Sequence, residues 1–292
     1  MTENYKIGNL EVSSPWGNAG GVAKTIEEVE MLASTSAGWI EAGSYTFELR
    51  AGNGSLEDTY FHNSLTGETF NSRGKANKGI DIVEKEIPSM REIAHLAGKR
   101  LLVNVAAISE DPLTELEELV PRAYEAGADA VLIAEAQNVF NEKGQSQQIV
   151  SNNEQAFKKL IDGLSGIVDK YRPVMIRTSP FENYAKARSV LRSISSDVVS
   201  AVFVSNTWPV KIPVDKNEEK IIKIQGNTCG KSGPAMAGEA FKQTAWALSA
   251  LRSGGRKIDV VSSSGIINGR ELKKRLRLGA VAGAGTTLYY ET

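Results

Sequence analysis

The stretch Ile258-Asp259-Val260-Val261-Ser262-Ser263-Ser264-Gly265-Ile266 joins a strand-like apolar run to a turn of small residues. A second junction of this kind follows, where the apolar run 280–284 gives way to Gly285-Thr286-Thr287. Small residues let backbone N–H groups approach a phosphate closely, so two such turns late in an alternating βα sequence predict a phosphate-binding site. Plain αβ connections share this local pattern, so the rest of the chain must decide.

Strand-like runs and amphipathic stretches alternate along the chain, which is typical of parallel βα units. The eight expected strands are 16–19, 39–44, 101–107, 130–136, 173–178, 198–206, 258–263 and 282–289. The expected helices are 25–33, which opens with a Thr25-x-x-Glu28 capping box, 113–126, 154–168, 182–194 and 237–251. No break in composition marks a second domain, so we predict one α/β domain over residues 1–292, a (β/α)8 TIM barrel.

Three segments do not fit the plain repeat: 6–12, which we expect to form an N-terminal hairpin, and the inserted loops 61–79 and 221–236. Loops that follow the strands of a barrel converge on its C-terminal face and build the site there. We therefore take all three segments as candidate lids over that face.

The composition points to a small-molecule partner. The 34 Lys and Arg residues nearly balance the 35 Asp and Glu residues, for a net charge of −1, and no long basic stripe indicates nucleic acid. The one cysteine, Cys229, and the two histidines, His62 and His95, give no metal-site spacing, so we expect no metal. No apolar run is long enough to span a bilayer and no signal peptide is evident, so we expect a cytoplasmic protein without a membrane partner.

Several motifs in register resemble the dihydroorotate dehydrogenase family of FMN-dependent barrels, and most closely its soluble class 1 branch. The order and spacing of these motifs agree with the family across essentially the whole chain. They are Asn18-Ala19-Gly20-Gly21, Thr46-Phe47-Glu48-Leu49-Arg50-Ala51-Gly52-Asn53, Asn71-Ser72-Arg73-Gly74-Lys75-Ala76-Asn77-Lys78-Gly79, Val103-Asn104-Val105-Ala106, Ser205-Asn206-Thr207 and Gly230-Lys231-Ser232-Gly233-Pro234-Ala235.

The resemblance implies FMN across the barrel mouth, hydride transfer from the substrate to flavin N5, and a homodimer. The cofactor contacts implied are Ala19, Gly20, Gly43, Ser44, Asn104, Arg177, Gly233, Ser264, Gly265, Gly285 and Thr286. The substrate contacts implied are Asn71, Gly74, Lys75, Asn206 and Thr207. Arg177 stands where the family carries a lysine, and a cation there stabilises the reduced flavin. Its alternative role is a structural ion pair with Glu135.

The chain departs from the family after the fourth strand. Where the family places Asn-x-Ser-Cys-Pro-Asn, with a cysteine or serine base, this chain reads Glu135-Ala136-Gln137-Asn138-Val139-Phe140-Asn141. Amide side chains take no proton from carbon, so Glu135 is the nearest ionisable replacement, with a pKa that burial would raise. We therefore list Glu135 and Arg177 as the candidate catalytic residues.

Two further sites are altered. The family's lysine after the second strand falls at Gly43, and Lys75 is a candidate to compensate for it. The family's Gly-Thr-Gly-Gly becomes Ser262-Ser263-Ser264-Gly265, which keeps the N–H groups and adds hydroxyl donors. Three functions stay open: oxidation of dihydroorotate to orotate in pyrimidine biosynthesis, a flavoprotein with another substrate, and a non-catalytic barrel that binds a phosphorylated ligand.

Overall fold

The computed structural model describes residues 5–135, 149–168, 173–224 and 226–285, and within them eight parallel strands close into a barrel. This confirms the predicted (β/α)8 fold. Around the barrel the strands are β10 (Val199–Val204), β13 (Asp259–Ser263), β14 (Ala282–Gly285), β3 (Trp16–Asn18), β4 (Trp39–Tyr45), β7 (Arg100–Val105), β8 (Ala130–Ala134) and β9 (Val174–Thr178).

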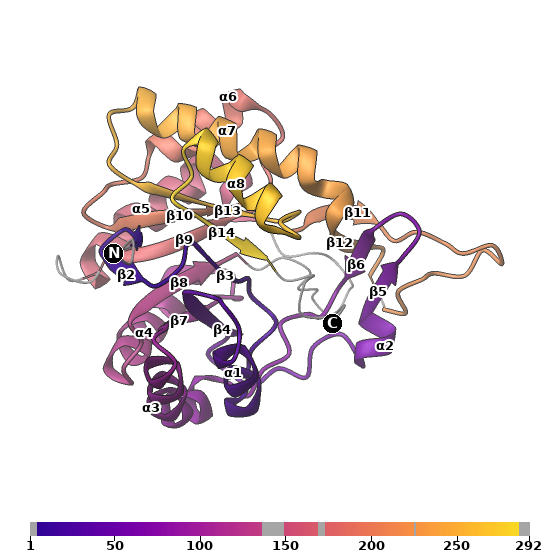
Figure 1. The fold of residues 1–292 in the computed structure, drawn as a ribbon, viewed down its shortest axis with the longest axis horizontal. Helices are drawn as coiled ribbons and strands as arrows, with labels where there is room; N and C mark the ends of the chain where they lie inside the picture. The colour runs from indigo at the N-terminus through magenta and orange to yellow at the C-terminus, as the bar shows by residue number, and fades with distance from the viewer. Residues whose placement is uncertain (1–4, 136–148, 169–172, 225, 286–292) are drawn as a thin grey trace.

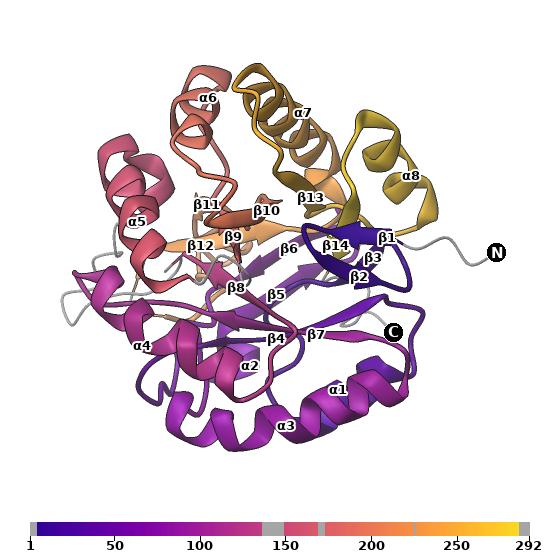
Figure 2. The same ribbon diagram turned by 90° about the vertical axis from the view of Figure 1, so that its left-hand side faces the viewer.

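Helices surround the strands, as the end-on view of Figure 2 shows. They are α1 (Ile26–Ala33), α3 (Ile80–Leu96), α4 (Pro112–Glu125), α5 (Glu154–Ile167), α6 (Tyr184–Arg192), α7 (Ala237–Ser253) and α8 (Gly269–Leu278). The capping box predicted at Thr25 and Glu28 is present at the start of α1. Helix α3, which contains Pro88, and the strongly charged helix α8 were absent from the sequence prediction.

Strands β1 (Tyr5–Ile7) and β2 (Leu10–Val12) form the predicted N-terminal hairpin, but it does not lie at the site. The backbone N–H of Gly8 donates to Asp259 Oδ2 at 2.7 Å, at the first residue of β13. Ile7 is fully buried against the barrel interior. The expectation that segment 6–12 is a lid is therefore wrong, because this hairpin covers the N-terminal end of the barrel.

The two long inserted loops meet in a second sheet at the other end of the barrel, on the right of Figure 1. Its order is β11-β12-β6-β5, and its middle strands pair residues far apart in the chain, such as Gly230 with Asn71. The strands are β11 (Trp208–Lys211), β12 (Thr228–Ser232), β6 (Glu68–Asn71) and β5 (Tyr60–Asn63), and the short helix α2 (Leu56–Thr59) precedes them. As predicted, these loops lie over the C-terminal face.

The barrel interior is apolar near the hairpin and polar near the inserted sheet. Trp39 and Phe203 meet edge to face, with ring centroids 6.5 Å apart and planes at 89°. Farther along the strands the fully buried Glu41 and Asn104 and the nearly buried Arg177 replace the apolar side chains. The barrel therefore offers a polar floor at its C-terminal end. Within the described residues, no helix has the length and apolar character required to cross a bilayer.

Candidate active site

A pocket opens where the C-terminal ends of the barrel strands face the inserted sheet. Its lining brings together most of the residues that the sequence singled out. Those residues are Ala19, Gly20, Ser44, Asn71, Gly74, Lys75, Arg177, Asn206, Thr207, Gly233, Ser264, Gly265 and Gly285. Gly43, Asn104 and Glu135 are not part of the lining, and Thr286 lies outside the described residues.

The turn that follows β13 forms one side of the pocket. Ser264 and Gly265 both adopt left-handed backbone conformations, with φ of 67° and 66°. A Cβ at Gly265 would lie 2.5 Å from the Cα of Ala237, and one at Gly285 would lie 2.9 Å from the carbonyl oxygen of Ile266. The two predicted corners therefore lie beside the same cavity and leave no room for larger residues.

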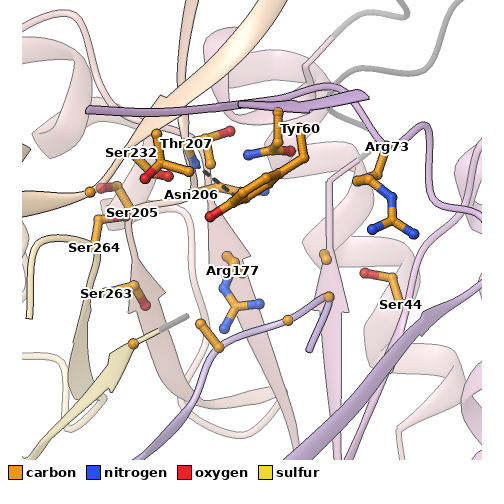
Figure 3. Close-up of a pocket in the computed structure, with 18 of the residues that line it drawn as sticks. Ser44, Tyr60, Arg73, Arg177, Ser205, Asn206, Thr207, Ser232, Ser263 and Ser264 are labelled. Atoms are coloured by element: carbon orange, nitrogen blue, oxygen red, sulfur yellow. Dashed lines mark hydrogen bonds between the residues drawn. The ribbon is translucent and has the colours of Figure 1, made fainter. Parts of the chain in front are cut away.

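Two buried serine hydroxyl groups lie on the same side of the pocket. The Oγ atoms of Ser205 and Ser263 are buried, and neither has a hydrogen-bond partner within the described part of the chain. In Figure 3 both serines lie near Ser264, at the ends of neighbouring strands. Buried polar atoms are normally satisfied, so these hydroxyls suit a ligand with acceptor oxygens.

Arg177 forms the centre of the pocket floor, and its partner is Glu41 rather than Glu135. Its Nη1 and Nη2 donate to Glu41 Oε1 and Oε2 at 2.5 and 2.6 Å, a bidentate pair with Glu41 fully buried. The predicted alternative of an Arg177–Glu135 ion pair is therefore wrong. A single acidic residue inside the apolar run Trp39-Ile40-Glu41-Ala42 was the sequence signal for this partner.

Asn104 lies below the floor and supports the ion pair. Its Nδ2 donates to Glu41 Oε1 at 2.5 Å, while its Oδ1 is buried without a partner among the described residues. Above the pair lies Gly20, where a Cβ would approach Glu41 Oε1 to 2.7 Å and Arg177 Nη1 to 2.9 Å. Gly20 therefore leaves the guanidinium accessible from the pocket.

The carboxylate of Glu135 is held by backbone and hydroxyl donors at the end of β8. It accepts hydrogen bonds from Ser151 N at 2.5 Å, Ser151 Oγ at 2.8 Å and Ser179 N at 2.6 Å. Burial raises the pKa of Glu135, and the hydrogen bonds from Ser179 and Ser151 oppose that rise. Both carboxylate oxygens therefore accept hydrogen bonds that link the end of β8 to the segments containing Ser151 and Ser179.

The backbone at Gly43 leaves no room for a side chain, so a lysine does not fit there. The φ of Gly43 is 122°, and a Cβ there would lie 2.3 Å from the carbonyl oxygen of Asn104. Its backbone instead accepts a hydrogen bond from Gly21 N at 3.0 Å. The amine of Lys75 reaches the neighbouring residue, with Nζ 3.4 Å from Ser44 Oγ. Its role as a compensating cation stays a prediction.

Several residues of the pocket were missed from the sequence. Lys24 and Arg73 bring two further cations, and Tyr60, Thr69 and Ser232 come from the inserted sheet. Arg73 belongs to a motif that was recognised, but its side-chain position was not predictable without the fold. No cluster of three or more His, Cys, Asp or Glu side chains suited to a metal occurs in the described ranges.

Comparison with known proteins assigns the chain to a family. The family model described as dihydroorotate dehydrogenase matches residues 3–292. The chain belongs to the dihydroorotate dehydrogenase family. A solved DHODH from Eimeria tenella, in complex with ferulenol, superposes with a TM-score of 0.78 at 18% identity, covering 98% of this chain and 79% of that one.

Curated members of the dihydroorotate dehydrogenase family align over nearly the whole chain. One from Neisseria meningitidis is 24% identical over 285 residues, which cover 96% of this chain and 81% of the relative. One from Wigglesworthia glossinidia brevipalpis is 23% identical over 278 residues, covering 95% and 80%. Both are named dihydroorotate dehydrogenase (quinone), so they do not single out the class 1 branch, which stays a prediction.

Proposed function

We propose that the chain is an FMN-dependent oxidoreductase that oxidises a small carboxylate, with dihydroorotate as the first candidate. The observation that carries this proposal is the pocket itself, in which the two glycine corners and the Arg177 guanidinium lie around one cavity. Family membership supports oxidoreductase chemistry. The cytoplasmic location and the homodimer remain predictions from the sequence.

The pocket fits the two ends of FMN. The close approach at Gly265 and Gly285 and the unpartnered Oγ of Ser263 suit a phosphate, which backbone N–H groups and hydroxyls would hold. Thr286 is proposed with them, although it lies outside the described residues. Ala19, Gly20, Ser44 and Gly233 would border the ring system, and Asn104 would act through Glu41.

When bound, FMN supplies a two-electron acceptor for the hydride of the substrate. Arg177 then holds a fixed positive charge on the pocket floor, and the bidentate contact with Glu41 keeps the guanidinium oriented. Asn71 and Asn206, with Gly74 and Thr207, line the part of the pocket nearest the inserted sheet and are proposed to orient the substrate.

The family's pattern does not identify the residue that accepts the substrate's proton, because segment 135–141 contains no Cys or Ser. Glu135 as the base stays a prediction, and its hydrogen bonds to Ser151 and Ser179 assign its carboxylate a structural role as well. The changed base segment and Gly43 favour the second candidate, a flavoprotein that has kept its cofactor and changed its substrate.

An absorbance spectrum tests these functions. We expect the purified protein, alone or after addition of FMN, to show a flavin band that dihydroorotate bleaches under anaerobic conditions. A stable band that dihydroorotate leaves unchanged would favour another substrate. Colourless protein that ignores added FMN would falsify the flavoenzyme proposal.

Two variants test the non-catalytic alternative. Arg177→Ala and Glu135→Gln are expected to slow flavin reduction by any donor that reduces the parent. If no donor reduces the parent and both variants behave identically to it, the chain is a binding protein rather than an enzyme.

A further inference from the structure

The pocket is lined by several cationic side chains. Besides Arg177, the side chains of Lys24, Arg73 and Lys75 line it. The lining contains no Asp or Glu among the described residues, and the carboxylate beneath the floor, Glu41, is already paired with Arg177. Within the described ranges, the wall of the cavity therefore offers these three cations no carboxylate partner.

The amines of the two lysines contact neutral oxygen atoms. Lys24 Nζ donates to the carbonyl oxygen of Ala76, and Lys75 Nζ lies 3.4 Å from Ser44 Oγ. The Nε of Arg73 is buried and has no hydrogen-bond partner within the described part of the chain. An unsatisfied guanidinium nitrogen at a pocket wall is costly, so a ligand oxygen is the expected partner.

The cations also act on one another. Burial, followed by the charges of Lys24 and Arg177, lowers the pKa of Lys75 to about 7, against the opposing effect of Glu135 and Glu41. Burial and Arg73 likewise lower the pKa of Lys24 to about 8, and Glu28 opposes that change. A bound anion would relieve this repulsion and favour the charged forms of both lysines.

The cationic cluster, defined as Lys24, Arg73 and Lys75, is separate from the phosphate corner. In Figure 3, Arg73 and Ser44 lie on one side of the pocket, and Ser263 and Ser264 lie on the opposite side, with Arg177 between them. A phosphate at the Ser264 corner therefore leaves the cluster available for a second ligand.

We propose that the cationic cluster selects a substrate with two anionic groups, a small dicarboxylate, over a monocarboxylate such as dihydroorotate. This inference rests on the proposed function, because it concerns the substrate side of the same pocket. Two carboxylates offer four acceptor oxygens to the three cations, whereas one carboxylate leaves part of the cluster without a counter-charge.

Calorimetric titration with a matched pair of planar probes tests the proposal. Pyridine-2-carboxylate and pyridine-2,3-dicarboxylate share one ring and differ by one carboxylate. For the parent protein saturated with FMN, we expect the dicarboxylate to bind about tenfold more tightly, the equivalent of about 1.4 kcal/mol. The Arg73→Gln/Lys75→Met double variant should lose this preference. Lys78→Met is the control, since Lys78 is exposed, pairs with Glu86 and does not line the pocket.

The titrations with and without FMN test the cationic cluster and the flavoenzyme function separately. Equal affinities for the two probes in the parent, or a preference that survives in the double variant, would overturn the cluster as a dianion site. Repeating the titration without FMN separates the two proposals. A dicarboxylate preference in protein that binds no FMN would reject the flavoenzyme and retain the cluster.

Discussion

Glu41 is the residue that holds the pocket floor together, since its carboxylate accepts from both Arg177 and Asn104. A buried ion pair contributes little compared with an apolar pair, but removing one partner leaves an uncompensated charge. We expect Glu41→Gln to lower the free energy of unfolding by about 3 kcal/mol, measured by urea denaturation.

The exposed pair of Lys158 and Asp162 on α5 provides the control for that measurement. Asp162→Asn should cost less than about 1 kcal/mol, because solvent screens a surface ion pair. A Glu41→Gln variant no less stable than Asp162→Asn would show that the buried pair does not hold the floor.

For single residues, the sequence indicated which side chains lie at the site but not which residues they pair with. Arg177 was predicted to lie at the site because it ends a strand within a recognised register. Its alternative role paired it with Glu135, which also ends a predicted strand, whereas Glu41 points into the barrel from the middle of β4. Every residue of β4 is buried, so no alternation in its sequence indicates which side chains point into the barrel.

At the scale of elements, the turn after β13 is the part of the pocket with the strictest steric requirement. Gly265→Ala would place a methyl group 2.5 Å from the Cα of Ala237, at a φ of 66°. We expect the dissociation constant for FMN, measured by quenching of flavin fluorescence, to rise at least about tenfold as the turn shifts.

Gly166→Ala is the control for Gly265→Ala. Gly166 lies in helix α5, and no atom lies within 4 Å of a Cβ added there. It should leave FMN affinity unchanged and stabilise the protein by up to about 1 kcal/mol. Unchanged FMN affinity in Gly265→Ala would disprove a phosphate contact at this turn.

The barrel strands were predictable because each is a short buried run bounded by small or polar residues. The inserted sheet was not, since β6 and β12 pair Asn71 with Gly230 and no local pattern reports such a contact. Helix α8 was missed for another reason. Its sequence, Gly269–Leu278, is dominated by charged side chains, and the buried residue described for it is Arg275.

For the whole molecule, the hairpin adds buried apolar packing at the end of the barrel opposite to the pocket. Ile7 of the hairpin is fully buried at the N-terminal end. Ile7→Ala should lower the free energy of unfolding by about 2–5 kcal/mol, because it leaves a cavity, while FMN affinity of the folded protein stays within about twofold. Urea denaturation and fluorescence quenching check the two halves of this expectation.

The neighbouring substitution Lys6→Ala controls for the hairpin, because Lys6 is exposed and pairs only loosely with the exposed Glu11, at 3.3 Å. It should change stability by less than about 0.5 kcal/mol. If fully folded Ile7→Ala protein bound FMN more weakly than the parent, the hairpin end and the pocket end of the barrel would be coupled.

The hairpin also bears on which end of the barrel tolerates change. Buried Ile7 and the Gly8–Asp259 hydrogen bond fix the N-terminal end, whereas the loops that line the pocket follow the C-terminal ends of the strands. Exchanges in the loops around the pocket, away from the buried Glu41–Arg177 pair, are therefore expected to alter ligand binding more than folding. Exchange of residues in the pocket loops is therefore a route to new chemistry in this barrel, because the hairpin packing at the N-terminal end stays intact.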